Sequence, residues 1–325
     1  MHTVAVSGVG GVIGYGIVRS LRSSRHQVSI IGLDMYPDAV GRHWCDTFET
    51  ALATASPSYP DYLLDVANRL GVELFIPGIE QDAFRWACES PAWEQACSAR
   101  FAVNRKDVVL DSHDKWKFHL RLTGSGFPAI RTAIGGSFSR LASEFGLPLV
   151  LKPRISYASK GLRIVEDAVS FDFWRSRLGD LFMVQEYVGR EDSEYTVSVF
   201  GLGDGRSSGK ISFRRKLNRE GSTVRAEVIS EPGLEDLVDG LVREFKPLGP
   251  TNFQFRRHEG VFLPLEINPR ISSSTSIRTA FGFNEAEMCV EYYLCGKEPM
   301  KPCILRGRAE RYLEDFLIPD ISQPD

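Results

Sequence analysis

Short apolar runs alternate with helical patterns over roughly the first hundred residues of the chain. Residues 4–6, 28–33 and 73–76 are mostly apolar stretches of strand length, and residues 62–70 space their apolar side chains as a helix does. Strands that alternate with helices predict βαβ units and a parallel sheet with helices on both faces. Residues 39–60 lack a clear period, and we expect loop and short helix there.

The pattern changes in the second half of the chain. Residues 111–146 are mostly helical, and two strands, 147–153 and 162–165, then form a predicted hairpin. Apolar and polar residues alternate along the later strands, as is typical of antiparallel sheet in an α+β arrangement. We expect these strands at 182–185, 195–200, 210–217, 223–229, 251–257 and 261–267, with an amphipathic helix at 234–245. The sequence therefore predicts an α/β part followed by an α+β part.

Composition and charge narrow the class of protein. The 325 residues carry 39 Lys and Arg against 42 Asp and Glu, and 43% of them are hydrophobic. A chain of this length forms two or three globular units, and its slightly acidic balance argues against a nucleic-acid partner. No apolar run approaches the ~18 residues that suggest a membrane span, and the start lacks the cationic residues of a signal peptide. We therefore expect a cytoplasmic protein.

A glycine-rich segment near the N-terminus allows two interpretations. Residues 8–14 lie between a predicted strand and a predicted helix, and Asp34 ends the next strand. This arrangement can bind a dinucleotide in a nicotinamide-dependent reductase or epimerase. Alternatively, the glycines only let the helix pack closely on the sheet. The Tyr-x-x-x-Lys pair that such a reductase needs occurs only at Tyr293 and Lys297, near the C-terminus, which disfavours the first interpretation.

A carboxylate and an amide lie two residues apart in the segment E-I-N-P-R, at Glu266 and Asn268. Positions i and i+2 of a strand face the same way, and a hairpin centred near Gly260 puts Gln254 directly opposite Glu266. Three side-chain oxygens then converge, a donor set that suits magnesium or manganese. Pro264 has no N–H to donate to a neighbouring strand, so this position must face away from the pairing partner, which makes the register less certain. The alternative interpretation is that these polar residues form the solvent-exposed face of a hairpin.

Three motifs follow one another in order after residue 150. V-L-K-P-R contains Lys152, Q-E-Y-V covers residues 185–188, and E-I-N-P-R ends a later strand. This order resembles the ATP-grasp enzymes, in particular the branch similar to the large subunit of carbamoyl phosphate synthase. The resemblance implies α/β and α+β parts: a Rossmann-like domain at 1–110 that binds no dinucleotide, a helical linker with the first ATP-grasp lobe at 111–185, and a second lobe with the catalytic core at 186–325. The two lobes would grip ATP between them.

The resemblance also implies nucleotide-binding residues. Lys115 and Lys152 correspond to the two lysines that approach the triphosphate, and Glu194 to the acid that takes the ribose hydroxyls. The hinge between the lobes, whose main chain binds adenine in the family, comprises Gln185, Glu186, Tyr187 and Val188. The loop over the phosphates is usually glycine-rich, but here it contains a single glycine, and its candidate phosphate donors are Ser159 and Lys160.

The reacting centre is implied in the same way. Gln254, Glu266 and Asn268 correspond to the magnesium ligands, and Lys210 and Arg270 to the groups that contact the transferred phosphate and the acyl phosphate. The planar guanidinium of an arginine suits a phosphate. Arg214 and Arg215 are weaker candidates for the same role.

These correspondences imply a stand-alone ligase that uses ATP and magnesium. ATP would convert a small carboxylate into an acyl phosphate, and a small amine would then displace phosphate. The sequence does not encode which carboxylate and which amine, and it leaves a homodimer open. Two alternatives remain: a nucleotide-binding regulator that kept the fold and lost turnover, favoured by the glycine-poor loop, and the nicotinamide-dependent reductase or epimerase.

Overall fold

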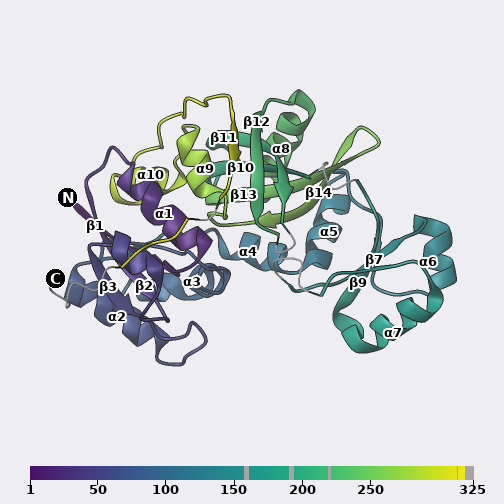
Figure 1. Cartoon of the computed structure of the whole chain (residues 1–325), viewed down its shortest axis with the longest axis horizontal. Coiled ribbons are helices and arrows are strands. Elements are labelled where there is room, and N and C mark those ends of the chain that lie inside the picture. The colour runs from purple at the N-terminus through teal and green to yellow at the C-terminus, as the bar shows by residue number, and fades with distance from the viewer. Residues whose placement is uncertain (157–160, 190–193, 219–220, 313, 319–325) are drawn as a thin grey trace, which may run out of the picture.

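The described part of the chain folds around three β-sheets (Figure 1). The structure is a computed structural model that describes residues 1–156, 161–189, 194–218, 221–312 and 314–318. An N-terminal unit carries the first sheet, a small lobe at the right of the view carries the second, and the third and largest sheet lies at the upper centre.

The N-terminal unit is the predicted parallel sheet with helices on both faces. Its strands run in the order β3-β2-β1-β4-β5, and all neighbours are parallel. Side chains alternate along β1, so that Val4 and Val6 pack with α1 while Ala5 packs with α2 and α3. Its elements are β1 (His2–Ser7), α1 (Val12–Arg22), β2 (Val28–Asp34), a 3₁₀ turn (Val40–Trp44), β3 (Thr47–Thr50), α2 (Tyr59–Leu70), β4 (Leu74–Ile76), α3 (Glu80–Trp93) and β5 (Arg100–Phe101). The edge strand β3 lies within residues 39–60, where the sequence predicts only loop and short helix.

Two helices, α4 (Lys106–His113) and α5 (Lys115–Gly124), lead into the small lobe. Its sheet has the order β6-β9-β7-β8, and the β7–β8 hairpin is antiparallel, as predicted. The lobe has its own core, formed by apolar side chains of the sheet and of α6 and α7. Its elements are β6 (Thr132–Ala133), α6 (Phe138–Phe145), β7 (Leu149–Pro153), β8 (Arg163–Val165), α7 (Ala168–Leu178), a 3₁₀ turn (Gly179–Leu181) and β9 (Phe182–Glu186).

The large sheet is antiparallel and has the order β14-β13-β10-β11-β12-β15. Helix α8 covers one face through the buried side chains of its apolar stripe. The other face packs with α10 and with α1 of the N-terminal unit. The elements are β10 (Glu194–Leu202), β11 (Ser207–Leu217), β12 (Thr223–Ile229), α8 (Pro232–Phe245), β13 (Leu248–His258), β14 (Val261–Asn268), α9 (Thr275–Ala280), α10 (Glu285–Cys289), a π turn (Val290–Leu294) and β15 (Arg308–Glu310).

The N-terminal unit and the large sheet share one apolar core. Val6 and Ile17 of the first belong to the same cluster as Ile211 and Phe213 of the second. After β15 the chain returns to the N-terminal unit, where the ring of Phe316 lies against Trp44 (Figure 1). The predicted domain limits near residues 110 and 185 remain predictions. No described helix combines the length and the apolar character that crossing a bilayer requires.

Candidate active site

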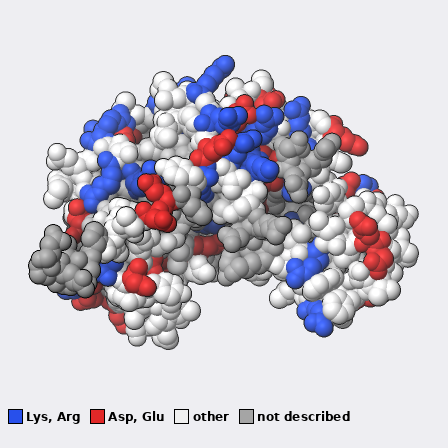
Figure 2. All heavy atoms as spheres, viewed as in Figure 1, with Lys and Arg blue, Asp and Glu red and all other residues white. Residues whose placement is uncertain are grey.

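A cavity of about 650 Å³ lies where the three parts of the fold meet. Figure 2 shows a notch between the small lobe and the rest of the molecule, and acidic and basic side chains are mixed over this face. The N-terminal unit contributes the first turns of α1 and α3, the small lobe contributes β7 and the end of β9, and the large sheet contributes β10, β11, β13 and β14. The cavity is therefore built from segments that are far apart in the sequence.

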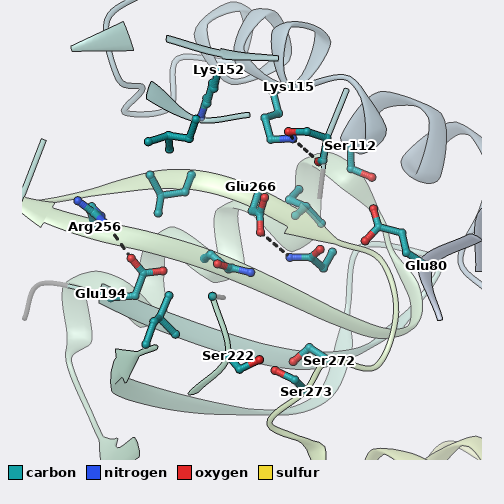
Figure 3. Close-up of a pocket in the computed structure, with 18 of the residues that line it drawn as sticks. Glu80, Ser112, Lys115, Lys152, Glu194, Ser222, Arg256, Glu266, Ser272 and Ser273 are labelled. Carbon is teal, nitrogen blue, oxygen red and sulfur yellow. Dashed lines mark hydrogen bonds and ion pairs between the residues drawn. The ribbon is translucent and has the colours of Figure 1, made fainter. Parts of the chain in front are cut away.

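Lys115 and Lys152 project into the cavity from one side (Figure 3). Lys115 opens α5, directly after Asp114, whose carboxylate caps the helix at the N–H of Trp116. The ammonium of Lys115 donates to the carbonyl and the hydroxyl of Ser156 at 2.6 and 3.2 Å. Burial, and then the charge of Lys115, lower the pKa of Lys152 to about 8. The two ammonium groups repel each other, and an anion bound between them would relieve this repulsion.

Glu266, Asn268 and Gln254 lie together on the opposite wall. The pairing of β13 with β14 sets Gln254 against Glu266, as predicted. The register shifts by one residue between Gln254 and Phe255, next to Pro264, which is where a proline without an N–H can be accommodated. The amide of Asn268 donates to one oxygen of Glu266 at 3.0 Å.

These three side chains fit a divalent cation. They offer one carboxylate and two amide oxygens, and magnesium completes such partial sets with water and substrate phosphates. No cluster of three His, Cys, Asp or Glu occurs within the described residues. The oxygen of Gln254 accepts a 2.6 Å hydrogen bond from Arg215, so this ligand would have to exchange its partner when a metal binds.

The end of β9 supplies the predicted hinge. Gln185, Glu186, Tyr187 and Val188 all line the cavity. The N–H of Glu186 donates to the carbonyl of Arg131 at 3.0 Å, and the carbonyl of Val188 accepts from Arg256 at 3.1 Å. The N–H of Val188 is used by no described hydrogen bond, and it is free to donate to a ligand at this edge.

Glu194 is buried at the start of β10, with 4% of its surface exposed. One of its oxygens accepts from Arg215 at 3.1 Å and the other from Arg256 at 3.3 Å. The carboxylate thus faces the cavity while both of its oxygens are held by arginines. The hydroxyls of a ribose would compete with the guanidinium groups of Arg215 and Arg256 for the carboxylate of Glu194.

Arg270 lies at the side of the cavity that adjoins the N-terminal unit. Its guanidinium donates to the carboxylate of Glu80 at 2.6 Å, at the first residue of α3. This pair joins residues 190 positions apart and neutralises part of the charge of Arg270.

The carboxylate of Asp34 is occupied by hydrogen bonds to the main chain at and near the glycine-rich segment of residues 8–14. Asp34 accepts hydrogen bonds from the N–H groups of Gly10 at 2.8 Å and Tyr36 at 3.0 Å. A Cβ at Gly14 would lie 2.1 Å from the carbonyl oxygen of Gly8, so only glycine lets α1 approach β1 here. Both observations favour the packing interpretation over a dinucleotide site.

Comparison with known proteins gives one partial sequence match and several matches of fold. A model of the family "ATP-grasp in the biosynthetic pathway with Ter operon" matches residues 180–310. The structure of a biotin carboxylase from Campylobacter jejuni is similar with a TM-score of 0.73 at 16% identity, over 94% of this chain and 74% of that one. The sequence match to the ATP-grasp family is confined to residues 180–310, and over the rest of the chain the similarity is one of fold.

Two ribonucleotide synthetases have a similar fold. N5-carboxyaminoimidazole ribonucleotide synthetase from Thermotoga maritima matches with a TM-score of 0.67 at 15% identity, over 93% of this chain and 78% of that one. The carboxyaminoimidazole ribonucleotide synthase from Aspergillus clavatus, solved with ATP, matches with a TM-score of 0.72 at 14% identity, over 94% and 80%. At these identities the likeness concerns the fold. The narrower carbamoyl-phosphate-synthase-like branch stays a prediction.

One predicted site residue needs correction. Lys210 does not line the cavity, and its ammonium is paired with Asp239 of α8 at 2.8 Å. The reason is the alternation of β11, because Lys210 and Arg215 have opposite parity and therefore face opposite sides of the sheet. Lys210 faces α8, while Arg215 faces the cavity. The predicted contact of Lys210 with the transferred phosphate is thus wrong.

The sequence underrates or misses three other cavity residues. Arg215 is only a weaker candidate there, although the parity of β11 could have favoured it over Lys210. Arg256 is not predicted, since it looks like a solvated strand residue. The sequence places the loop that ends at Glu80 near the acceptor pocket but assigns Glu80 no role, since it gains its partner only through the fold. Arg214 lies outside the cavity lining and pairs with Glu227. Ser159 and Lys160 lie outside the described residues.

Proposed function

We propose that this chain is an ATP- and magnesium-dependent ATP-grasp ligase that joins a carboxylate to an amine through an acyl phosphate. One observation carries the proposal: Lys115 and Lys152 face Glu266 across a single cavity (Figure 3). Asn268 and Gln254 lie beside Glu266 and line the same cavity. Cations on one wall and oxygen donors on the other suit a triphosphate that is bridged to a metal ion.

The proposal places the adenine, the ribose and the triphosphate of the nucleotide at different parts of the cavity. Adenine lies against residues 185–188, where the free N–H of Val188 donates to the ring. The ribose lies near Glu194, and the triphosphate extends between Lys115 and Lys152. Magnesium or manganese, held by Gln254, Glu266 and Asn268, supplies charge neutralisation at the transferred phosphate when it is bound.

Arg215 takes the role that Lys210 cannot fill. In the ligand-free arrangement it bonds Glu194 and Gln254, and its buried Nε has no partner within the described chain. A ribose at Glu194 and a metal at Gln254 would release the guanidinium toward the phosphate. Arg270 is the second arginine that we assign to the acyl phosphate.

The proposed reaction has two steps. An oxygen of the carboxylate attacks the γ-phosphorus, the bond to the bridging oxygen breaks, and ADP leaves. The amine nitrogen then attacks the acyl carbon, the bond to the phosphate oxygen breaks, inorganic phosphate leaves, and the amine gives up a proton. The side chains contribute position and charge, because phosphoryl transfer needs no protein nucleophile.

Nucleotide binding and ADP release test the proposal. We expect the wild type to bind MgATP in calorimetry, and to release ADP with a productive pair from a panel of carboxylates and amines. Glu266→Gln combined with Asn268→Ala should abolish ADP release, because it removes the carboxylate and one amide of the metal site. Turnover that survives this change, or a wild type that fails to bind MgATP, contradicts the proposal.

A nucleotide-binding regulator is the second candidate. It is favoured by the single glycine in the loop at 154–161, because fewer glycines limit main-chain approach to the phosphates. MgATP binding without ADP release across the whole panel would favour it.

We further propose a cytoplasmic homodimer. The assembly is supported by the description of a matched 2-oxoglutarate carboxylase domain as a dimer. Light scattering of the purified chain tests the assembly.

A further inference from the structure

We infer that the cavity has a second anion site, for a carboxylate or phosphate group that a substrate carries in addition to the group being activated. This site is formed by Ser222, Ser272, Ser273 and the first turn of α1, and we call it the serine end of the cavity. Naming its ligand as a substrate rests on the proposed ligase function. Figure 3 shows the three hydroxyls gathered on the side of the cavity opposite Lys115 and Lys152.

The first turn of α1 opens onto this end of the cavity. Val12 and Ile13 line the cavity, and the helix begins without a side-chain cap. No described hydrogen bond uses their N–H groups. The start of an 11-residue helix therefore presents unpaired donors and the positive end of its dipole, which together attract an anion.

The hydroxyl of Ser272 is an independent sign of a missing ligand. Ser272 has 7% of its surface exposed, it lines the cavity, and its oxygen has no partner within the described chain. A buried hydroxyl without a partner is unfavourable. An oxyanion would accept the hydrogen bond that the protein leaves unmade.

Packing brings the serines to the start of α1. Helices α1 and α9 lie side by side and run the same way: Gly16 faces Thr275, and the hydroxyls of Ser20 and Thr279 are 2.7 Å apart. Because both pairs have the same offset, the loop that precedes α9, with Ser272 and Ser273, lies beside the first turn of α1. Ile13 also packs against the cluster that contains Ile271.

The charges around the serine end favour an anion. Arg311 donates to the carbonyl of Ser273 at 2.6 Å, and its other terminal nitrogen is buried without a partner in the described chain. No described carboxylate pairs with it. Glu80 of the cavity lining is already paired with Arg270, and Asp34, beside the start of α1, accepts from the N–H of Gly10. Arg311 therefore brings to the serine end a positive charge that no described carboxylate pairs with.

The ligand at this end differs from ATP and from the carboxylate that is activated. The triphosphate belongs between Lys115 and Lys152, and the activated carboxylate must reach its γ-phosphate. Ser272 and Ser273 lie on the side of Glu266 that is away from Lys115 and Lys152 (Figure 3), so a group bound there is separate from the triphosphate. The substrate class that fits is a molecule with a second acidic group, which the protein uses for position and specificity.

Calorimetry with two small probes tests the site. The protein is first saturated with MgADP, so that the nucleotide part of the cavity is filled, and inorganic phosphate or malonate is then titrated. We expect at least one probe to bind; phosphate alone, malonate alone or both would identify the acidic group. Ser272→Ala should weaken that binding by about 2- to 10-fold. Ser272→Asp should abolish it, because the new carboxylate occupies the site.

Ser208→Ala is the matched control. Its hydroxyl is equally buried and unpartnered among the described residues, but Ser208 lies outside the cavity lining, so binding should not change. If Ser272→Asp does not fold, Ser273→Asp replaces it. A wild type that binds neither probe, or binding that withstands the aspartate, overturns the inference. Failure of MgADP to bind counts against the proposed function alone, and the same titration on the nucleotide-free protein still tests the serine end.

Discussion

The two facing walls of the cavity differ in how their polar groups are satisfied. On the sheet wall, Glu266 accepts from Asn268, and Arg215 holds both Glu194 and Gln254. On the lysine wall, Lys115 meets only the neutral oxygens of Ser156, and Lys152 has no described hydrogen bond or ion pair. The sheet wall is thus assembled before a ligand arrives, whereas the ammonium groups of the lysine wall form no ion pair within the described chain and are only partly balanced by the charge of Glu266.

A buried ion pair supports the sheet wall from behind. Arg278 and Glu285 are fully buried, and Arg278 also donates to Asn252, which pairs with Asn268 across the strands. Breaking this support gives the largest expected effect: Arg278→Met should lower the free energy of unfolding by about 3–5 kcal/mol, because Glu285 is left as a buried charge. Urea denaturation measures it. The double variant Arg278→Met/Glu285→Leu should regain part of the loss, and a single variant as stable as wild type contradicts the prediction.

Removing a charge from the lysine wall should act on binding and spare stability. Lys152→Met is expected to weaken MgATP binding by about 10- to 100-fold, because a charge-assisted contact with phosphate is lost. Calorimetry with a non-hydrolysable ATP analogue measures this change. Lys152→Arg, which keeps the charge, should retain more affinity than Lys152→Met. Equal losses in the two variants would mean that charge is not what Lys152 contributes.

The same wall should make nucleotide affinity depend on pH. The pKa of Lys152 is lowered to about 8, and the protonated form binds phosphate, so affinity should fall by up to about tenfold per unit as pH rises above 8. In the free protein the sign for stability is opposite. Between pH 8 and the ordinary lysine pKa the unfolded chain binds more protons, and the free energy of unfolding rises with pH. Lys152→Met should flatten both profiles; a profile unchanged by the variant assigns the titration elsewhere.

The smallest effect is expected at Lys210, which shares the large sheet but not the cavity. Lys210→Met removes a partly exposed pair with Asp239, and the free energy of unfolding should fall by less than about 1 kcal/mol. MgATP affinity should stay at the wild-type value, which makes this variant a matched control for Lys152→Met. A large loss of affinity would return Lys210 to the binding site.

Local patterns predict the fold and much of the sheet wall. The period of the apolar residues distinguishes the parallel from the antiparallel part, and E-I-N-P-R locates two of the proposed metal ligands. The predicted pairing of Gln254 with Glu266 is correct, although it results from two differences that cancel. The turn is centred between Glu259 and Gly260 rather than at Gly260, and one extra residue in β14 next to Pro264 restores the predicted register. Such a shift is hard to foresee because a bulge depends on both strands.

Contacts between distant segments could not be predicted in this way. Glu80 meets Arg270 only because α3 and the end of β14 reach the same cavity. The hold of Arg215 on Glu194 and Gln254 depends on which strands are neighbours, and a motif does not carry that information. The error at Lys210 has another origin, because a resemblance in sequence gives the position of a residue along the strand but not the face of the sheet on which its side chain lies.

The core shared by α1 and the large sheet decides which part of the molecule can move. Val6, Ile17, Ile211 and Phe213 tie the N-terminal unit to the large sheet, and Phe316 fastens the returning chain onto the same unit. The small lobe, by contrast, keeps a separate core. These two parts should therefore act as one rigid body, and the small lobe should move relative to it. Entry and exit of a nucleotide then depend on the segments that flank the small lobe. In that movement the serine end keeps its position, whereas Lys152 of β7 moves with the small lobe.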